Sequence, residues 1–186
     1  MSNDLGYFSH IPVLAALTAR TLAKRSVLEL GMGWGSTPLL HALCRLDGRG
    51  LYSYETDPAW MDTFRFLEGD FHRFRPVKSW EGETFSQEWD QPGVESRYSV
   101  AFIDCAPGEI RRELALRLKD RCEYIILHDA LCDGVHGGGG DYRYESILPQ
   151  FKYHAYYGVL RPATLALSNF RDVGISEVEQ KLRTIL

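Results

Sequence analysis

The sequence predicts an α/β fold in which a doubly wound, mostly parallel sheet carries helices on both faces. The first observation is that short apolar runs end abruptly at a glycine or at an acidic or histidine residue. Strands that are buried on both faces have this nearly continuous apolar character. The second observation is that helical patterns lie between these runs, and alternating strands and helices are typical of a parallel sheet.

Four apolar runs carry this prediction, and each leads into a residue that could serve a binding site. The runs are residues 27–30, 51–54, 100–103 and 124–127, followed by Gly31, Glu55, Asp104 and the pair His128-Asp129. Residues 75–79 form a weaker candidate strand. Because parallel strands end at the same edge of a sheet, we expect these positions to converge there.

Helix signals separate the strands. Thr37 and Asp57 are predicted N-caps, and each is followed by a proline that suits a first helical turn. A stripe of apolar residues four apart predicts a third helix over Ile110, Leu114 and Leu118. We interpret the basic residues interleaved with that stripe as its solvated face: Arg111, Arg112, Arg117, Lys119 and Arg121.

The carboxyl-terminal part has a different pattern. The β-rich residues 152–158 and 163–169 flank a short turn that contains Pro162, which predicts an antiparallel hairpin. A last helix is predicted from residue 176 onward. No interdomain linker interrupts the chain, so we expect residues 1–186 to form one domain.

Composition and charge narrow the classes of partner. The chain has 45% hydrophobic and 25% charged residues, as ordinary globular proteins do, and its formal net charge is −4. This charge disfavours nucleic-acid backbones and anionic membranes as partners. No apolar stretch approaches the roughly 20 residues that span a bilayer, and residues 1–10 lack the pattern of a secretory signal. We therefore expect a cytoplasmic protein with no membrane or nucleic-acid partner.

A glycine-rich turn, Glu29-Leu30-Gly31-Met32-Gly33-Trp34-Gly35-Ser36, lies between a strand and a helix. Glycines in such a turn tolerate a positive φ and let a ligand approach the backbone. Dinucleotide sites have the spacing GxGxxG, whereas this spacing is GxGxG, with Ser36 at the third position. Glu55 follows one βα unit later, where an acid can accept hydrogen bonds from ribose hydroxyls. The pattern predicts a ribose-containing cofactor and disfavours NAD.

At these residues the chain resembles the class I S-adenosylmethionine-dependent methyltransferases, whose first motif is similar to residues 27–35. The resemblance implies a Rossmann-like, seven-stranded sheet with an antiparallel last hairpin, and S-adenosylmethionine as cofactor. The residues implied to bind it are Glu29, Gly31, Met32, Gly33, Gly35, Glu55 and Asp104. The family also offers a polar residue to adenine after the third strand. Here Trp80 could stack on the ring and Glu81 could accept from its amino group, or both could be loop residues over the core.

Asp104, His128 and Asp129 are the candidate catalytic residues. An imidazole beside carboxylates can act as a general base toward a hydroxyl or amine. The segment 126–130 is similar to that of small-molecule methyltransferases in which a His-Asp-Ala sequence closes this strand. Metal-dependent catechol-type enzymes have aspartates at the positions of Asp104 and Asp129, but an asparagine where this chain has Ala130. The resemblance thus leaves open whether these two residues hold a divalent cation, and His128 could instead only shape the loop.

The leading hypothesis is methyl transfer to an oxygen or nitrogen of a small-molecule acceptor, in a pocket that is open or completed by the partner in a homodimer. The alternatives are a non-catalytic cofactor-binding or assembly protein of the same fold and, less favoured, an NAD-dependent oxidoreductase. Around the site, His10 is expected in a segment folded over the cofactor. Cys105 is expected to line the pocket rather than to act as a nucleophile. Residues 136–144, which include Tyr142 and Tyr144, are expected either to roof the site or to form a surface loop.

Overall fold

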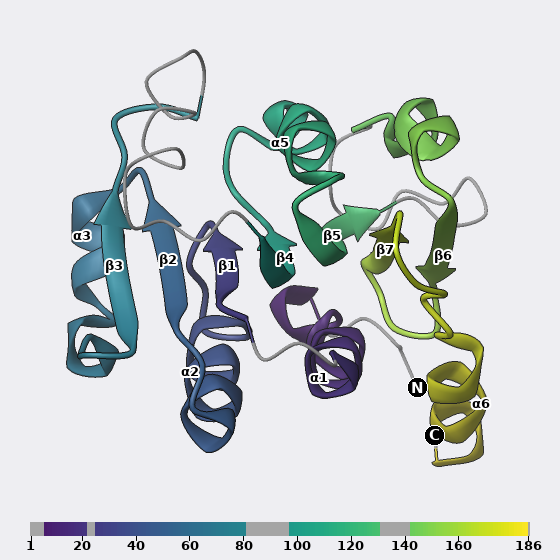
Figure 1. The fold of residues 1–186 in the computed structure, drawn as a ribbon, viewed down its shortest axis with the longest axis horizontal. Coiled ribbons are helices and arrows are strands. Elements are labelled where there is room, and N and C mark those ends of the chain that lie inside the picture. Colours follow the sequence, from purple (N-terminus) through teal and green to yellow (C-terminus); the bar gives the residue numbers. More distant parts are fainter. Residues whose placement is uncertain (1–5, 22–24, 81–96, 131–141, 186) are drawn as a thin grey trace.

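A computed structural model describes residues 6–21, 25–80, 97–130 and 142–185. At its centre is a seven-stranded sheet with the strand order β3-β2-β1-β4-β5-β7-β6. Figure 1 shows these strands side by side, with helices around them. The predicted doubly wound, mostly parallel sheet is confirmed.

The first five strands are parallel to one another. They are β1 (Val27–Leu30), β2 (Leu51–Glu55), β3 (His72–Pro76), β4 (Tyr98–Ile103) and β5 (Cys122–Ala130). From β1 the chain winds outward to β2 and β3, and then reverses to β4 and β5 on the other side. Ligands of open α/β sheets bind at the carboxyl ends of the strands where this reversal occurs. In this protein that point lies between β1 and β4.

The third strand begins at His72, earlier than the predicted residues 75–79. It alternates inward and outward side chains, with His72 and Phe74 buried and Arg73 and Arg75 exposed. An edge strand needs only one apolar face. The beginning of this strand therefore has no continuous apolar run to predict it.

The antiparallel hairpin is also confirmed. It consists of β6 (Tyr153–Tyr157) and β7 (Ala163–Ser168), and β7 lies between β5 and β6. The dinucleotide-binding sheet instead has the order 3-2-1-4-5-6. The inserted antiparallel β7 therefore separates this fold from that of the nicotinamide dehydrogenases.

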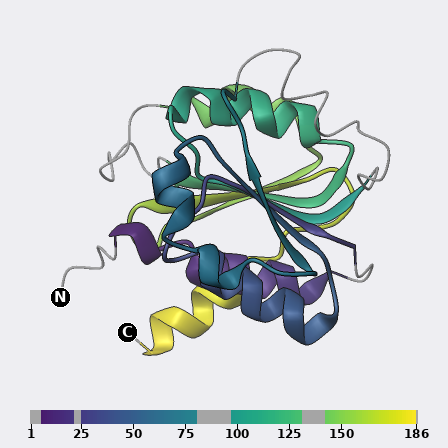
Figure 2. The ribbon, with the colours of Figure 1, turned by 90° about the vertical axis from the view of Figure 1, so that its left-hand side faces the viewer.

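Helices cover both faces of the sheet, as Figure 2 shows. On one face lie α1 (Ile11–Arg20), α2 (Thr37–Asp47) and α6 (Ser176–Ile185), and on the other lies α5 (Arg111–Leu118). The shorter helical elements are α3 (Pro58–Asp62) and the 3-10 turns Gly6–Phe8, Arg65–Leu67, Gly108–Ile110 and Tyr144–Gln150. No helix among the described residues is long and apolar enough to cross a membrane.

Alternation along the strands creates two separate cores. In β4, Val100 and Phe102 belong to the core beneath α1, whereas Ala101 and Ile103 belong to the core beneath α5. Successive strand residues point to opposite faces, so this division follows from the period of two. Both cores meet the carboxyl edge of β4 and β5, where the candidate catalytic residues lie.

Candidate functional site

At Gly31 the backbone of the glycine turn lies against the backbone of Asp104. The φ of Gly31 is +92°, and a Cβ atom there would lie 2.5 Å from the carbonyl oxygen of Asp104. No larger residue fits this position without moving the backbone. At Gly33, by contrast, a Cβ atom would make an ordinary 3.6 Å contact with the Ser36 hydroxyl oxygen. Gly31 is thus required for the junction of β1 and β4, and packing does not require Gly33.

Glu55, at the end of β2, is hydrogen-bonded to the glycine turn. Its Oε2 atom accepts a hydrogen bond from the Met32 backbone N–H at 3.0 Å. Its Oε1 atom accepts from the N–H groups of Thr56 at 2.7 Å and Asp57 at 3.0 Å. The Met32 carbonyl in turn accepts from the Trp60 indole N–H at 2.7 Å. The turn is therefore fixed by the residues that flank it.

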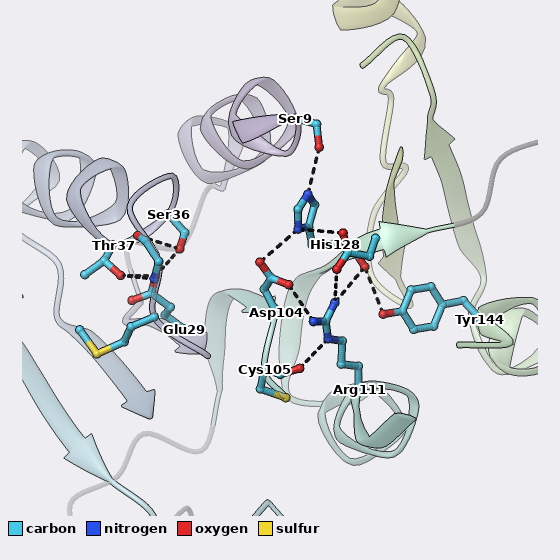
Figure 3. Close-up of polar contacts among 12 residues, drawn as sticks. Ser9, Glu29, Ser36, Thr37, Asp104, Cys105, Arg111, His128 and Tyr144 are labelled. Carbon is cyan, nitrogen blue, oxygen red and sulfur yellow. Dashed lines mark hydrogen bonds and ion pairs between the residues drawn. The ribbon is translucent and has the colours of Figure 1, made fainter. Parts of the chain in front are cut away.

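Glu29 is fully buried and contacts the start of α2. Its Oε1 atom accepts from the Ser36 hydroxyl at 2.6 Å and the Thr37 hydroxyl at 2.9 Å, and Figure 3 shows these three residues. Its Oε2 atom accepts from the Ser53 hydroxyl at 2.5 Å. Burial raises the pKa of Glu29 to about 7. The prediction that Thr37 is the N-cap is wrong, because the helix begins at Thr37 and its hydroxyl is directed at Glu29. Glu29 holds the turn in place and has no exposed surface for a ligand.

Of the two residues predicted to contact adenine, the structure describes only Trp80. Trp80 is only 2% exposed and packs in the core beneath α5, so an adenine ring could stack on it only after a rearrangement. Glu81 lies outside the described residues. Trp34, which the sequence analysis did not single out, is 53% exposed within the glycine turn, and its ring lies 4.8 Å from that of Phe64. The sequence signal for Trp34 was a large aromatic residue between two glycines of the turn.

The structure brings Asp104, His128 and Asp129 together. The His128 Nδ1 atom lies 3.1 Å from Asp104 Oδ2 and 3.5 Å from Asp129 Oδ1. The His128 Nε2 atom lies 2.9 Å from the hydroxyl oxygen of Ser9, which precedes α1 (Figure 3). His128 itself is only 1% exposed. Both imidazole nitrogens therefore already have partners, and the Ser9 contact had no sequence signal.

Strand β5 is irregular at its end, where His128 and Asp129 lie. The register of β5 against β7 shifts between Leu127 and Ala130, and Asp129 has a φ of +55°. Such a backbone conformation is uncommon outside glycine and is concentrated at functional sites. His128 contacts the segment before α1 and Asp129 contacts α5 on the opposite face, as the alternation of successive strand residues predicts.

Arg111 is the main correction to the sequence analysis. The prediction that Arg111 lies on a solvated helix face is wrong, because it is buried and its guanidinium contacts Asp104 Oδ1 and Asp129 Oδ2, each at 3.0 Å. Its spacing of three and seven residues from Leu114 and Leu118 places it on the apolar face of α5. The guanidinium occupies one oxygen of each carboxylate and offsets their charge, which weakens Asp104 and Asp129 as a pair of metal ligands.

The pKa values of Asp104 and Cys105, the two residues that follow β4, shift in opposite directions. Burial alone would raise the pKa of Asp104, but the hydrogen bond and charge of His128 and the charge of Arg111 together lower it. Burial raises the pKa of Cys105 to about 12, so its thiol stays protonated. This agrees with Cys105 as a residue lining the site rather than a nucleophile.

Two tyrosines in the segment before β6 contact His128 and Arg111. The Tyr144 hydroxyl donates to the His128 carbonyl at 3.1 Å, and the Arg111 guanidinium lies 5.0 Å from the centre of the Tyr142 ring. These contacts place both tyrosines beside the site, which agrees with the first of the two alternatives for this segment. His136 and Asp141, the other residues considered for a lid, lie outside the described residues.

No protein-family model matches the chain, and no curated protein matches its sequence. Solved structures do match its fold. The O-methyltransferase TomG from Streptomyces achromogenes, in complex with S-adenosylmethionine, gives a TM-score of 0.62 at 16% identity over 84% of this chain and 78% of that chain. The O-methyltransferase from Bacillus cereus, in complex with SAH, gives 0.58 at 16% identity over 90% and 84%.

The METTL16 methyltransferase domain gives a TM-score of 0.57 at 16% identity and covers 85% of this chain. The match covers 65% of that domain, so this chain spans less than two thirds of its length. At such low identity the likeness concerns architecture: seven strands, helices on both faces and an antiparallel β7. This protein has the Rossmann-like fold of the S-adenosylmethionine-dependent methyltransferases.

Proposed function

We propose that this protein is an S-adenosylmethionine-dependent methyltransferase acting on an oxygen or nitrogen of a small-molecule acceptor. The observation that carries the proposal is the junction of Glu55 with the glycine turn, at the edge where the winding of the sheet reverses. Support also comes from fold neighbours that hold S-adenosylmethionine or SAH. The position of β7 favours this cofactor over a dinucleotide.

The residues of the turn fit such a cofactor. When bound, it supplies an electrophilic methyl group on a sulfonium sulfur. The backbone of residues 31–35 would hold its methionine part, and Glu55 Oε2, which accepts one hydrogen bond from Met32, can accept another from a ribose hydroxyl. Trp34 offers an exposed ring to adenine in place of Trp80. Glu29 acts as a positioning residue, because it reaches only the hydroxyls that fix the turn.

On the acceptor side, the carboxylates of Asp104 and Asp129 are the exposed groups, with side chains 22% and 20% accessible. Asp104 can accept the Nδ1–H of His128, which leaves Nε2 as a proton acceptor. The Ser9 hydroxyl now occupies that nitrogen. A proton leaving the acceptor would therefore reach His128 through the Ser9 hydroxyl or after Ser9 moves aside. Alignment of the acceptor with the methyl group would supply much of the rate.

Calorimetric titration with S-adenosylmethionine and, separately, with NAD tests the cofactor. We expect S-adenosylmethionine to bind and NAD not to bind. Glu55→Gln should weaken binding by about 10-fold or more, because hydrogen bonds to a charged group are worth about 1.5–3 kcal/mol. Glu177→Gln, at an exposed position on α6, is the matched control and should bind as the unaltered protein does. Binding of NAD alone would refute the proposal, and an unchanged affinity in Glu55→Gln would refute the role of Glu55.

One observation favours the second candidate, a non-catalytic protein that binds the same cofactor. His128 is buried with both ring nitrogens bonded, so it offers no free base in this state. The two candidates differ in turnover: only an enzyme converts the cofactor to its demethylated product in an acceptor screen. His128→Gln should abolish that conversion while leaving cofactor affinity unchanged.

A further inference from the structure

His10 is a buried imidazole next to the backbone of Gly35. It occupies the N-cap position of α1, yet its side chain does not cap the helix, and it is only 2% exposed. Among the described residues, neither ring nitrogen makes a hydrogen bond of normal geometry. Leaving a buried polar group unsatisfied costs about 1–3 kcal/mol, so each such group requires an explanation.

The surroundings of His10 point to a ligand at this position. Its ring centroid lies 4.6 Å from that of Phe102 and 4.6 Å from that of His128. One nitrogen from each of His10 and His128 and one oxygen of Asp104 all lie within 4.8 Å of one another. Two imidazoles and a carboxylate thus converge from three segments that are distant in the sequence.

We propose that His10, His128 and Asp104 form a binding site for a first-row divalent transition metal ion such as Zn²⁺. Two imidazoles with one carboxylate is a donor set typical of such ions, and three protein ligands leave a fourth position open. Mg²⁺ prefers oxygen ligands throughout and does not suit this set. The site also differs from the Asp104 and Asp129 pair, which Arg111 already neutralises.

The distances are close to those that an ion requires. Two ligand atoms that each lie about 2.1 Å from one tetrahedral ion are about 3.4 Å apart. His128 Nδ1 and Asp104 Oδ2 are 3.1 Å apart, so the ion could enter between them in place of the shared proton. His10 would have to approach by roughly 1–1.5 Å from the 4.8 Å limit of the cluster to meet the same geometry.

The neighbours of these ligands suit the proposed site. Ser9 contacts the Nε2 atom of His128, which fixes the ring and leaves Nδ1 directed at the ion. Arg111 contacts Oδ1 of Asp104 and leaves Oδ2 for coordination. The partly exposed Asp104 side chain gives the ion a path from solvent. If the proposed function holds, the ion would lower the pKa of an acceptor hydroxyl; binding of the ion does not depend on that function.

The test is a titration of the full, untagged chain with Co²⁺, followed by visible absorption and by competition with Zn²⁺ and Mg²⁺. We expect one Co²⁺ per chain, displaced by Zn²⁺ but not by Mg²⁺. His10→Phe keeps a ring against Phe102 and removes both nitrogens, so it should weaken binding by at least about 10-fold. Because neither ring nitrogen of His10 makes a hydrogen bond of normal geometry, the metal-free variant should melt close to the temperature of the unaltered protein. Should the variant fail to fold, Asp104→Asn tests a second ligand and should also weaken binding.

Two controls identify the site. His154→Phe changes an exposed histidine on β6, and His41→Phe changes a second pair, in which His41 and His72 lie 3.0 Å apart between their Nδ1 atoms. Both variants should bind Co²⁺ as the unaltered protein does. An absence of any Co²⁺ signal, unchanged binding in His10→Phe, or loss of binding in His41→Phe would each overturn the proposal. Cofactor titration of the same samples reports on the methyltransferase proposal separately.

Discussion

Replacing Glu29 with glutamine tests the energetic effect of a buried carboxyl under the glycine turn. Its pKa is raised from 4.5 to about 7, mainly by burial and against the effect of three hydroxyl donors. At 1.36 kcal/mol per pKa unit, ionising Glu29 in the folded state carries a penalty on the order of 3 kcal/mol. Between pH 4.5 and about 7 the folded chain keeps a proton that the unfolded chain has released. The free energy of unfolding should therefore fall as the pH rises through this window, and should stay low above it.

Glutamine should imitate the protonated carboxyl. Ser53 contacts both Glu29 Oε2 and, at 2.9 Å, the Nε2 atom of His72. An amide N–H in place of Oε2 can donate to Ser53, whose own hydroxyl is then free to donate to His72. At pH 8 we expect Glu29→Gln to be more stable than the unaltered protein by on the order of 3 kcal/mol, equivalent to roughly 6–12 °C in Tm for a chain of this size. Near pH 4.5 the two proteins should be equally stable.

Urea denaturation followed by circular dichroism at several values between pH 4.5 and 8 measures this difference. Glu177→Gln, which changes an exposed glutamate, serves as the control and should show the pH dependence of the unaltered protein. The reasoning fails if Glu29→Gln is no more stable at pH 8, or if it differs from the unaltered protein by the same amount at every pH. Either result would mean that the carboxylate is well solvated by its three hydroxyl partners.

Two further substitutions test the geometry of the carboxyl edge by urea denaturation. Gly31→Ala should lower the free energy of unfolding by about 2–4 kcal/mol, because it combines a positive φ with a Cβ atom 2.5 Å from the Asp104 carbonyl oxygen. Gly69→Ala, where no atom lies within 4 Å of the new Cβ, should change it by less than about 1 kcal/mol, and equal losses would contradict the argument. Arg111→Met should cost about 3–5 kcal/mol at pH 7, since it leaves the carboxylates of Asp104 and Asp129 without their cation. Arg112→Met, on the same helix but only partly buried, should cost less than about 1 kcal/mol, and a loss as large as that of Arg111→Met would rule out a special role for the latter.

The sheet could be predicted because its strands follow local rules. The runs that end at Gly31, Glu55, Asp104 and His128 are mostly apolar, as is typical of strands buried on both faces, and they predict four of the five parallel strands. The edge strand at His72 alternates instead, and only its later half was predicted. Convergence of the strand-end residues followed from topology, because neighbouring parallel strands share an edge.

The partners of those residues could not be predicted in the same way. Ser9 contacts His128 across 119 positions of sequence, and such a pairing depends on how α1 packs on the sheet. Arg111 could have been found, because its spacing from Leu114 shows it on the apolar face, but its positive charge suggested solvent. The irregularity of β5 at Asp129 comes from a register shift against β7, which neither strand encodes alone. Local periodicity gives the elements, whereas the polar contacts depend on tertiary packing.

The contacts of the carboxyl edge also connect the two halves of the core. Ser9 contacts His128 from the α1 face, and Arg111 contacts Asp104 and Asp129 from the α5 face. The complete arrangement of contacts therefore forms only when the helices on both faces of the sheet are in place.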